Sequence, residues 1–206
     1  MIIAIDGTLA SGKGTLAKRV AAHYGLKRLD SGAIYRAVAL AVLDAGADPG
    51  DAAAAEAAAR AIDLEAIDED RIRSSAVGAA ASVVAAIPAV RAALLDAQRA
   101  FAVGGAVIDG RDIGTVVCPD ADVKFYVTAD FATRVERRWN ELRARGETIA
   151  LAALATEVAA RDKRDAERPI SPMKPAPDAH LLDTTALSIE AAAAAACRII
   201  DAVLHI

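Results

Sequence analysis

A glycine-rich stretch near the start of the chain contains the residue types that hold phosphate groups. Residues 7–15 read GTLASGKGT, so two glycines flank a four-residue interval and are followed by lysine, glycine and threonine. Glycines permit a tight loop whose backbone N–H groups point inward at anionic oxygens. Lys13 can reach the outer phosphates as a point charge, and the Thr15 hydroxyl can hold Mg²⁺. The pattern predicts a nucleotide-phosphate site formed by Gly7, Ala10, Ser11, Gly12, Lys13, Gly14 and Thr15.

Residues 30–36, DSGAIYR, indicate a second site for an anion. Ser31 opens an expected helix, and the N–H groups of a helix N-terminus attract negative charge. Arg36 lies about one helical turn further along and can add a guanidinium. The alternative is an ordinary helix cap followed by a surface arginine.

Residues 109–115, DGRDIGT, follow an expected strand. Open α/β sheets bind ligands beyond the carboxyl ends of their strands. Asp109 at such an end can act in the shell of a metal ion, as the acid of a phosphoryl-transfer site does. Arg111 and Asp112 then offer a cation and an acceptor to the crevice. The alternative is an ion pair within a loop.

Residues 161–168, RDKRDAER, are dense in charge. If the segment is helical, Arg161, Asp165 and Arg168 fall at positions i, i+4 and i+7 on one face. Two guanidiniums and a carboxylate on one face suit phosphates and a ribose hydroxyl. The alternative is a solvated helix with salt bridges on its surface.

The elements that position these residues alternate between strands and helices. We expect strands at 2–5, 26–29, 106–109, 123–128 and 181–183, the first being an apolar run typical of a buried parallel strand. We expect helices at 13–24, 31–43, 51–61, 74–86, 88–103, 131–145, 148–167 and 188–204, and a charged connector over 63–73. This alternation predicts one α/β domain over 1–206 with a helical insert near 46–90.

Composition excludes several other classes. The net charge is −4 and aromatic residues make up 3% of the 206 residues, which argues against a nucleic-acid binder. No uninterrupted apolar stretch reaches the length of a membrane span, and the first residues lack the features of a signal peptide, so we expect a cytoplasmic protein. Cys118 and Cys197 have no metal-ligand spacing and are interpreted as small buried side chains.

Five motifs together resemble one known family. GTLASGKGT, LDSGAIYR, SVVAAIPAVR, DGRDIGTVV and RDKRDAER, the last followed by a proline-rich loop, are similar to those of bacterial cytidylate kinases and extend over essentially the whole chain. The resemblance implies a P-loop fold with a central parallel sheet flanked by helices, a nucleoside-monophosphate-binding insert and a short lid near 145–168. It implies transfer of a phosphoryl group from ATP to CMP or dCMP with Mg²⁺. We expect the protein to be a monomer.

The resemblance also implies roles for individual residues. Ser31, Arg36 and Arg111 would hold the acceptor phosphate. Ser82, Arg91 and Asp112 would read cytosine, whose amino group donates and whose N3 and O2 accept. Arg161 and Asp165 would hold the sugar, and Arg168 would join the arginines around the transferring group. Lys13, Arg111, Arg161, Arg168 and Asp109 would form the catalytic set, and Arg137 would face ATP.

Two features depart from the family pattern. Thr8 stands where many members have proline, and the stretch from Pro49 to Arg73 is too brief for the small sheet that longer members have there. Two other functions remain as alternatives. One is a P-loop kinase with another acceptor, such as AMP, UMP or a small metabolite. The other is a regulatory module that senses or hydrolyses ATP without an acceptor.

Overall fold

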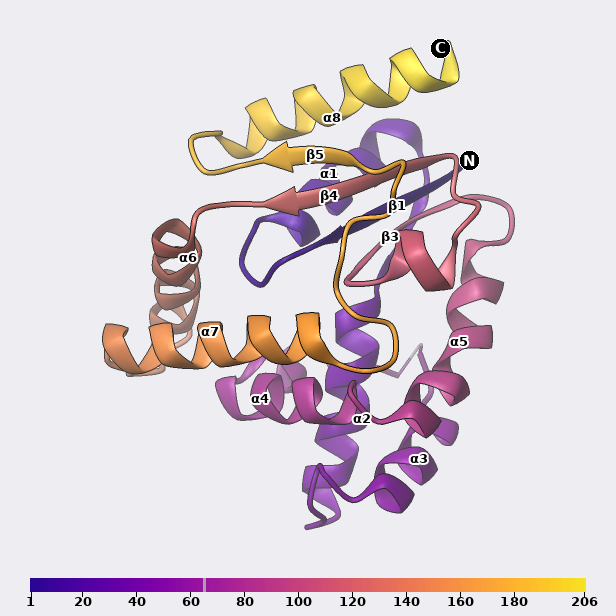
Figure 1. Ribbon diagram of the computed structural model, residues 1–206. Coiled ribbons are helices and arrows are strands. Elements are labelled where there is room, and N and C mark those ends of the chain that lie inside the picture. Colours follow the sequence, from indigo (N-terminus) through magenta and orange to yellow (C-terminus); the bar gives the residue numbers. More distant parts are fainter. Residues whose placement is uncertain (65) are drawn as a thin grey trace.

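Five parallel strands form the centre of the protein in the computed structural model, which describes residues 1–64 and 66–206. They are β1 (Ile2–Gly7), β2 (Lys27–Asp30), β3 (Ala106–Gly110), β4 (Val123–Thr128) and β5 (His180–Asp183). Their spatial order is β2-β3-β1-β4-β5, as Figure 1 shows in part. The α/β class with a central parallel sheet is therefore confirmed. Glu65, which belongs to the connector expected over 63–73, lies outside the described residues.

The central position of β1 follows from its apolar sequence. Ile3, Ala4 and Ile5 are fully buried, as is typical of a parallel strand covered on both faces. In the register of the sheet, Ile5 lies opposite Asp109 of β3 and Phe125 of β4. The carboxyl ends of these three strands therefore meet at one edge, which brings the residues that follow β1 and β3 together.

One face of the sheet is covered by α1 (Lys13–Tyr24) and α8 (Ile189–Leu204), of which α8 lies above the strands in Figure 1. Leu16 and Val20 of α1 and Ile200 of α8 pack in one core with Phe125. The helix α8 begins where the sequence predicts, because the Ser188 side chain accepts a hydrogen bond from the backbone of α8.

The opposite face is covered by α5 (Pro88–Ala102) and by η2 (Ile113–Val117), a single π-helical turn. The turn was not expected from the sequence. The carboxylate of Asp6 accepts hydrogen bonds of 2.8 Å from the backbone N–H groups of Ile113 and of Gly114. Because this anchor comes from β1, more than a hundred residues earlier, no local pattern indicates it.

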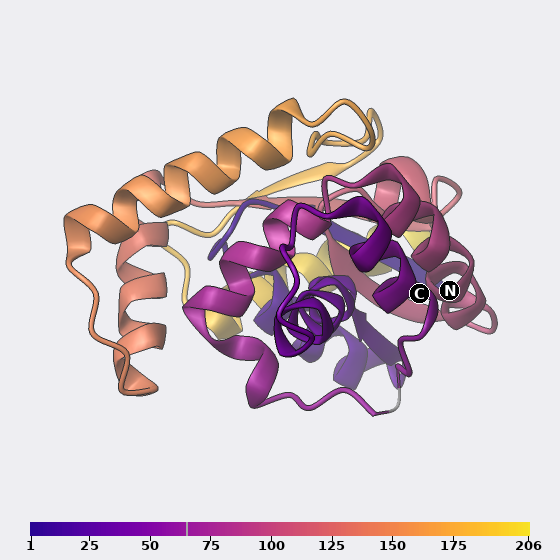
Figure 2. The ribbon, with the colours of Figure 1, turned by 90° about the horizontal axis from the view of Figure 1, so that it is seen from below.

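A layer of helices lies beyond β2, the strand at one edge of the sheet. It comprises α2 (Ser31–Asp44), α3 (Ala52–Arg60), the short η1 (Arg71–Arg73) and α4 (Ser75–Val84), which share a core with α5. Figure 2 shows these helices gathered around α2. The described residues between 46 and 90 include no strand, in agreement with the helical insert expected there, while the insert's boundaries stay a prediction.

Two further helices, α6 (Phe131–Ala144) and α7 (Leu151–Glu167), pack against each other near the carboxyl ends of the strands (Figures 1 and 2). Their apolar faces meet in a small core formed by Val135, Leu142, Leu154 and Val158. The helix expected at 148–167 begins at Leu151, three residues later than predicted, after the backbone of Ala150 in an extended conformation.

Among the described residues, no single helix has both the length and the apolar composition to cross a membrane. The pair α4 and α5 meets those two requirements jointly, but the two helices are bent by 98° where they meet.

Candidate active site

The loop after β1 has the tight geometry that its glycines predict. A side chain on Gly7 would place its Cβ 2.0 Å from the carbonyl oxygen of Val127, so that only glycine fits beside β4. Ala10 and Gly12 both have positive φ angles, of 58° and 86°. Because Gly12 is the N-cap of α1 and has no side chain, the first N–H groups of this helix remain open to an anion.

Lys13 lies at the start of α1 and donates a hydrogen bond of 3.1 Å to the carbonyl of Thr8, within the same loop. Burial of its ammonium and repulsion from Arg111 lower the pKa of Lys13 to about 7, although Asp109 and Asp30 oppose the shift. The carboxylates nearby therefore do not compensate the charge of Lys13. An anion bound in the loop would.

Three arginines approach the same region from separate elements. Arg36 comes from α2, Arg111 follows β3 and Arg161 comes from α7. Burial and repulsion from Arg111 lower the pKa of Arg161 to about 10. Within the described part of the chain, the buried Nε atoms of Arg36 and Arg161 have no hydrogen-bond partner. Clustered cations with unused donors form a site for a phosphate.

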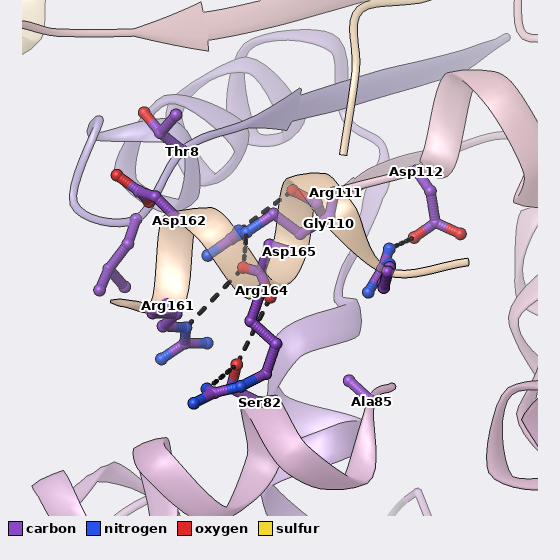
Figure 3. A network of polar contacts seen from close by, with 12 residues as sticks. Thr8, Ser82, Ala85, Gly110, Arg111, Asp112, Arg161, Asp162, Arg164 and Asp165 are labelled. Atoms are coloured by element: carbon purple, nitrogen blue, oxygen red, sulfur yellow. Dashed lines mark hydrogen bonds and ion pairs between the residues drawn. The ribbon is translucent and has the colours of Figure 1, made fainter. Parts of the chain in front are cut away.

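Asp165 of α7 is the carboxylate that holds two of these arginines. Its Oδ2 lies 3.0 Å from Nε of Arg111 and 3.9 Å from Nε of Arg161 (Figure 3). Burial alone would raise the pKa of Asp165, but Arg111 and Arg161 outweigh it and hold the pKa below its usual value. Asp165 therefore stays ionised, orients Arg111 by a hydrogen bond and attracts Arg161 through the longer ion pair.

The same carboxylate connects α7 to Ser82 of α4. The hydroxyl of Ser82 donates to Oδ1 of Asp165 at 3.5 Å and accepts from Nη1 of Arg164 at 2.8 Å (Figure 3). A cavity of about 150 Å³ lies between α4, α6 and α7, and Ser82, Arg161 and Arg164 are among the residues that line it. Polar groups expected on the acceptor side thus border one cavity.

A second buried network surrounds Asp112. Its carboxylate pairs with Arg91 of α5 and, at 3.2 Å, with Nη2 of Arg168, and all three side chains are buried. The guanidinium of Arg91 also lies 5.4 Å from the ring centre of Tyr35. Donors and an acceptor held together without access to water can recognise the edge of a heterocyclic base.

Arg168 does not share the helical face expected for it. The helix α7 ends at Glu167, and Arg168 follows it with an extended backbone. Its Nε donates to the carbonyl of Ser171, while its Nη2 reaches Asp112. Arg161 and Asp165 do lie one helical turn apart as predicted, but Arg168 belongs to the network around Asp112.

Asp109 lies at the end of β3, and its carboxylate is already paired with a cation. Its Oδ1 accepts from Nη2 of Arg28 at 2.8 Å and from Nε at 3.0 Å. Burial and the nearby Asp30 raise the pKa of Asp109 to about 6, against the pull of Arg28 and Lys13. Arg28 is a residue that the sequence analysis missed, because its position in a short edge strand looks like ordinary surface.

Ser31 and Arg36 are held by backbone and carboxylate partners at the start of α2. The hydroxyl of Ser31 is buried and donates to the carbonyl of Asp109 at 2.9 Å. Asp30 caps α2 through the N–H of Ala33, and it also pairs with Nη2 of Arg36 at 2.9 Å. The N-cap of α2 is therefore Asp30, and Arg36 forms an ion pair with it.

The donors available to a metal ion are few. No cluster of three or more His, Cys, Asp or Glu side chains that could hold a metal occurs in the described part of the chain. The sequence indicated two oxygen donors for a metal ion here, namely the hydroxyl of the exposed Thr15 and the carboxylate of Asp109, whose Oδ2 lies near Gly14 of the loop. Such a set fits Mg²⁺, which keeps waters and binds through one or two protein oxygens together with substrate phosphates.

Two further polar residues touch the loop of residues 7–15 and have no motif in the sequence. The guanidinium of Arg134 donates to the carbonyl of Leu9 at 3.2 Å and to Asp162 of α7 at 2.6 Å. The hydroxyl of Thr184 lies 2.8 Å from the carbonyl of Ser11, and Arg137 contacts Thr184 rather than the loop itself. Only the tertiary fold brings these residues to the loop.

Comparisons with known proteins agree over nearly the whole chain. The sequence profile described as cytidylate kinase matches residues 3–202. The chain is 56% identical over 205 residues to a cytidylate kinase from Nitrobacter winogradskyi, covering 98% of this chain and 97% of the relative. It is 57% identical over 203 residues to a cytidylate kinase from Methylocella silvestris, covering 98% and 94%. A solved structure of an uncharacterized protein from Eubacterium ventriosum has a similar fold, with a TM-score of 0.60 at 14% identity and 98% of each chain covered.

Proposed function

This chain belongs to the cytidylate kinase family, and from that premise we propose which of its residues perform each part of the reaction. The enzyme transfers the γ-phosphoryl group of ATP to CMP or dCMP, giving ADP and CDP or dCDP. The observation that best supports our assignment is the cluster of Lys13, Arg36, Arg111 and Arg161, where burial lowers the pKa of both Lys13 and Arg161.

The phosphates of ATP bind to the loop of residues 7–15. The positive φ angles of Ala10 and Gly12 support this assignment, since they shape a loop whose N–H groups can face one anion. Lys13 supplies the charge for the outer phosphates. When bound, Mg²⁺ would neutralise charge on the transferring group, and Thr15 and Asp109 would help to hold it.

The phosphate of CMP binds to the arginines. Arg36 and Arg161 each have a buried Nε without a hydrogen-bond partner among the described residues, and Arg111 is held by Asp165. Arg161 and Asp165 hold the sugar; in support, Arg161 lines the cavity between α4, α6 and α7, and Asp165 accepts a hydrogen bond from Ser82, which also lines it. Ser31, the first residue of α2, also holds this phosphate, together with the N–H groups at the N-terminus of the helix.

Cytosine is read by Ser82, Arg91 and Asp112. Asp112 can accept from the N4 amino group, and the guanidinium of Arg91 can donate to N3 or O2. The burial of both residues supports this role, because mispaired polar groups cost more without water. Uracil carries O4 in place of the amino group and a proton on N3, so the same groups would be mispaired.

The chemistry needs no strong base. The oxygen of the acceptor phosphate that attacks is already ionised near neutral pH, so the protein's contribution is positioning and charge stabilisation. Lys13 and the arginines Arg36, Arg111, Arg161 and Arg168 neutralise the charge that develops on the transferring group. Arg161 and Asp165 are on α7, so movement of this lid, near 145–168, would assemble the site and exclude water.

We further propose that the active species is a cytoplasmic monomer that requires neither nucleic acid nor a membrane. The net charge of −4 supports the absence of a nucleic-acid partner. Cys118 and Cys197 are both free thiols, which suits a reducing compartment.

The helical insert near 46–90 is the part that binds the nucleoside monophosphate. It includes Ser82 of α4, and α5, which begins at Pro88 near its end, contains Arg91.

The assignment of the arginines is tested by Arg161→Gln, with Arg60→Gln as a matched control on the exposed face of α3. An assay of ADP release would offer CMP, dCMP, UMP, AMP and GMP in turn with ATP and Mg²⁺. We expect Arg161→Gln to raise KM for CMP and to lower kcat, while Arg60→Gln behaves as the parent protein does. If Arg161→Gln kept the parent kinetics, Arg161 would be removed from the site.

A further inference from the structure

Thr184 follows β5 directly and lies against the phosphate-binding loop. Its side chain is buried, and its Oγ1 lies 2.8 Å from the carbonyl oxygen of Ser11 and 3.1 Å from that of Thr128. Its backbone N–H already donates to the carbonyl of Thr128 at 2.8 Å. A hydroxyl has one proton, and the shorter contact takes it to Ser11.

This hydrogen bond fixes the orientation of a peptide plane within the loop. In a trans peptide the carbonyl of one residue and the N–H of the next point to opposite sides. Because the carbonyl of Ser11 points at Thr184, the N–H of Gly12 points away from Thr184. No hydrogen bond between described residues uses that N–H, so it is available to an anion.

The loop needs such an anchor because its backbone is not relaxed. Ala10, two residues before Gly12, has a φ of 58° without being glycine. A backbone of this kind persists only where its surroundings hold it. Ser11, the next residue, is completely buried, and its carbonyl is the one that Thr184 binds.

Arg137 of α6 orients the hydroxyl of Thr184 by donating a hydrogen bond to it. Its Nη1 donates to Oγ1 of Thr184 at 3.0 Å, and its Nη2 donates to the carbonyl of Thr184 at 2.7 Å. A hydroxyl that accepts a hydrogen bond from a guanidinium must turn its own proton elsewhere. The proton is left to the carbonyls of Ser11 and Thr128, of which Ser11 is the closer at 2.8 Å against 3.1 Å. A continuous chain of contacts therefore runs from α6 through Thr184 to the loop.

We propose that Thr184 is a positioning residue for ATP, and that Arg137 acts on ATP through Thr184 rather than by touching the nucleotide. Thr184 orients the peptide between Ser11 and Gly12, and Arg137 orients the hydroxyl of Thr184. The inference rests on the proposed function in one respect, namely that residues 7–15 bind the phosphates of ATP.

The main test compares Thr184→Val, which keeps the shape but removes the hydroxyl, with Thr184→Ser, which keeps the hydroxyl. Binding of the analogue AMP-PNP with Mg²⁺ would be measured by calorimetry, and KM for ATP and for CMP by the ADP-release assay. We expect Thr184→Val to weaken AMP-PNP binding about tenfold, since one hydrogen bond is lost and a buried carbonyl is left without a donor. Thr184→Ser should bind within about twofold of the parent, and KM for CMP should stay within about twofold in both.

Ser188→Ala is the control for loss of stability. The Ser188 hydroxyl caps α8 through the N–H of Ala191, and no hydrogen bond between described residues joins it to residues 7–15, so its removal lowers the melting temperature by loss of one hydrogen bond. We expect this variant to bind AMP-PNP as the parent does. The inference is overturned if Thr184→Val binds as tightly as the parent, or if Ser188→Ala weakens binding equally.

A double-mutant cycle tests the role of Arg137. Arg137→Met alone should weaken AMP-PNP binding, and combining it with Thr184→Val should add little, because both act on one peptide. Additive losses would mean that Arg137 contacts the nucleotide independently, which contradicts the inference. Arg137 is half-buried, so this variant serves as the test should Thr184→Val fail to fold.

Lys13→Ala separates failure of this inference from failure of the proposed function. If Lys13→Ala binds AMP-PNP as the parent does, the loop is not the ATP site and both are wrong. If Lys13→Ala loses binding while Thr184→Val and Arg137→Met keep it, the proposed function stands and the positioning role is wrong. Loss of binding in all three supports both.

Discussion

Lys13 should take up a proton when ATP binds. In the free protein, burial and Arg111 lower the pKa of Lys13 to about 7. At pH 8 the side chain is therefore only about one-tenth protonated, since one pKa unit is a factor of ten. Phosphates placed against Lys13 favour its charged form and return the pKa toward about 10.4. Binding at pH 8 should then take up about 0.9 proton per site.

The uptake can be measured by calorimetric titration with AMP-PNP in several buffers whose ionisation enthalpies differ. The slope of the observed enthalpy against the buffer enthalpy counts the protons. We expect a slope of about 0.9 at pH 8 and about 0.1 at pH 6, where Lys13 is already charged. The affinity for the analogue should also fall by nearly tenfold for each pH unit above about 7.

Lys13→Arg supplies the control, because a guanidinium keeps its proton throughout this range. Its slope at pH 8 should be smaller than that of the parent by about 0.9. The slope that Lys13→Arg still shows gives the number of protons taken up by all other groups. Arg161, whose pKa is about 10, stays protonated at pH 8 and adds nothing. A wild-type slope equal to that of Lys13→Arg would refute the reasoning, since Lys13 would then be charged before ATP arrives.

Three further predictions concern groups that are buried at the carboxyl ends of the strands. Asp112→Ala should raise KM for CMP and weaken discrimination against UMP; it should also lower the free energy of unfolding in urea by about 3–5 kcal/mol, because Arg91 and Arg168 lose their shared carboxylate. Gly7→Ala should abolish AMP-PNP binding in calorimetry, because its Cβ would lie 2.0 Å from a carbonyl oxygen of β4. Burial raises the pKa of Asp6 to about 6, so the folded state holds this proton more tightly than the unfolded state does. Stability should therefore fall as the pH rises from about 4 to about 6, and urea titrations should show a shallower fall in Asp6→Asn.

Much of the site follows from local spacing. The spacing from Gly7 to Lys13 predicts a loop between a strand and a helix. The structure has β1 before the loop and α1 after it. Arg161 and Asp165 are one turn apart on α7, so the prediction that they share a face needed only the period of a helix. Such features depend on residues a few positions apart, which a sequence displays directly.

The contacts that were missed depend on the register of distant strands. Arg28 reaches Asp109 because β2 pairs with β3, and nothing around Arg28 indicates that partner. Thr184 reaches Ser11 because β5 lies beyond β4 at the edge of the sheet. The end of α7 is a third case. Arg168 follows the helix instead of belonging to it, and it contacts Ser171 and Asp112. The charge pattern of 161–168 did not predict this.

The strand order has a consequence for synthesis of the chain on the ribosome. β1 is made first, yet its partners β3 and β4 begin at residues 106 and 123, and Thr184 emerges later still. Pairing between such distant segments closes long loops and is slow. A nascent chain therefore carries its phosphate-binding sequence long before the structure that shapes it.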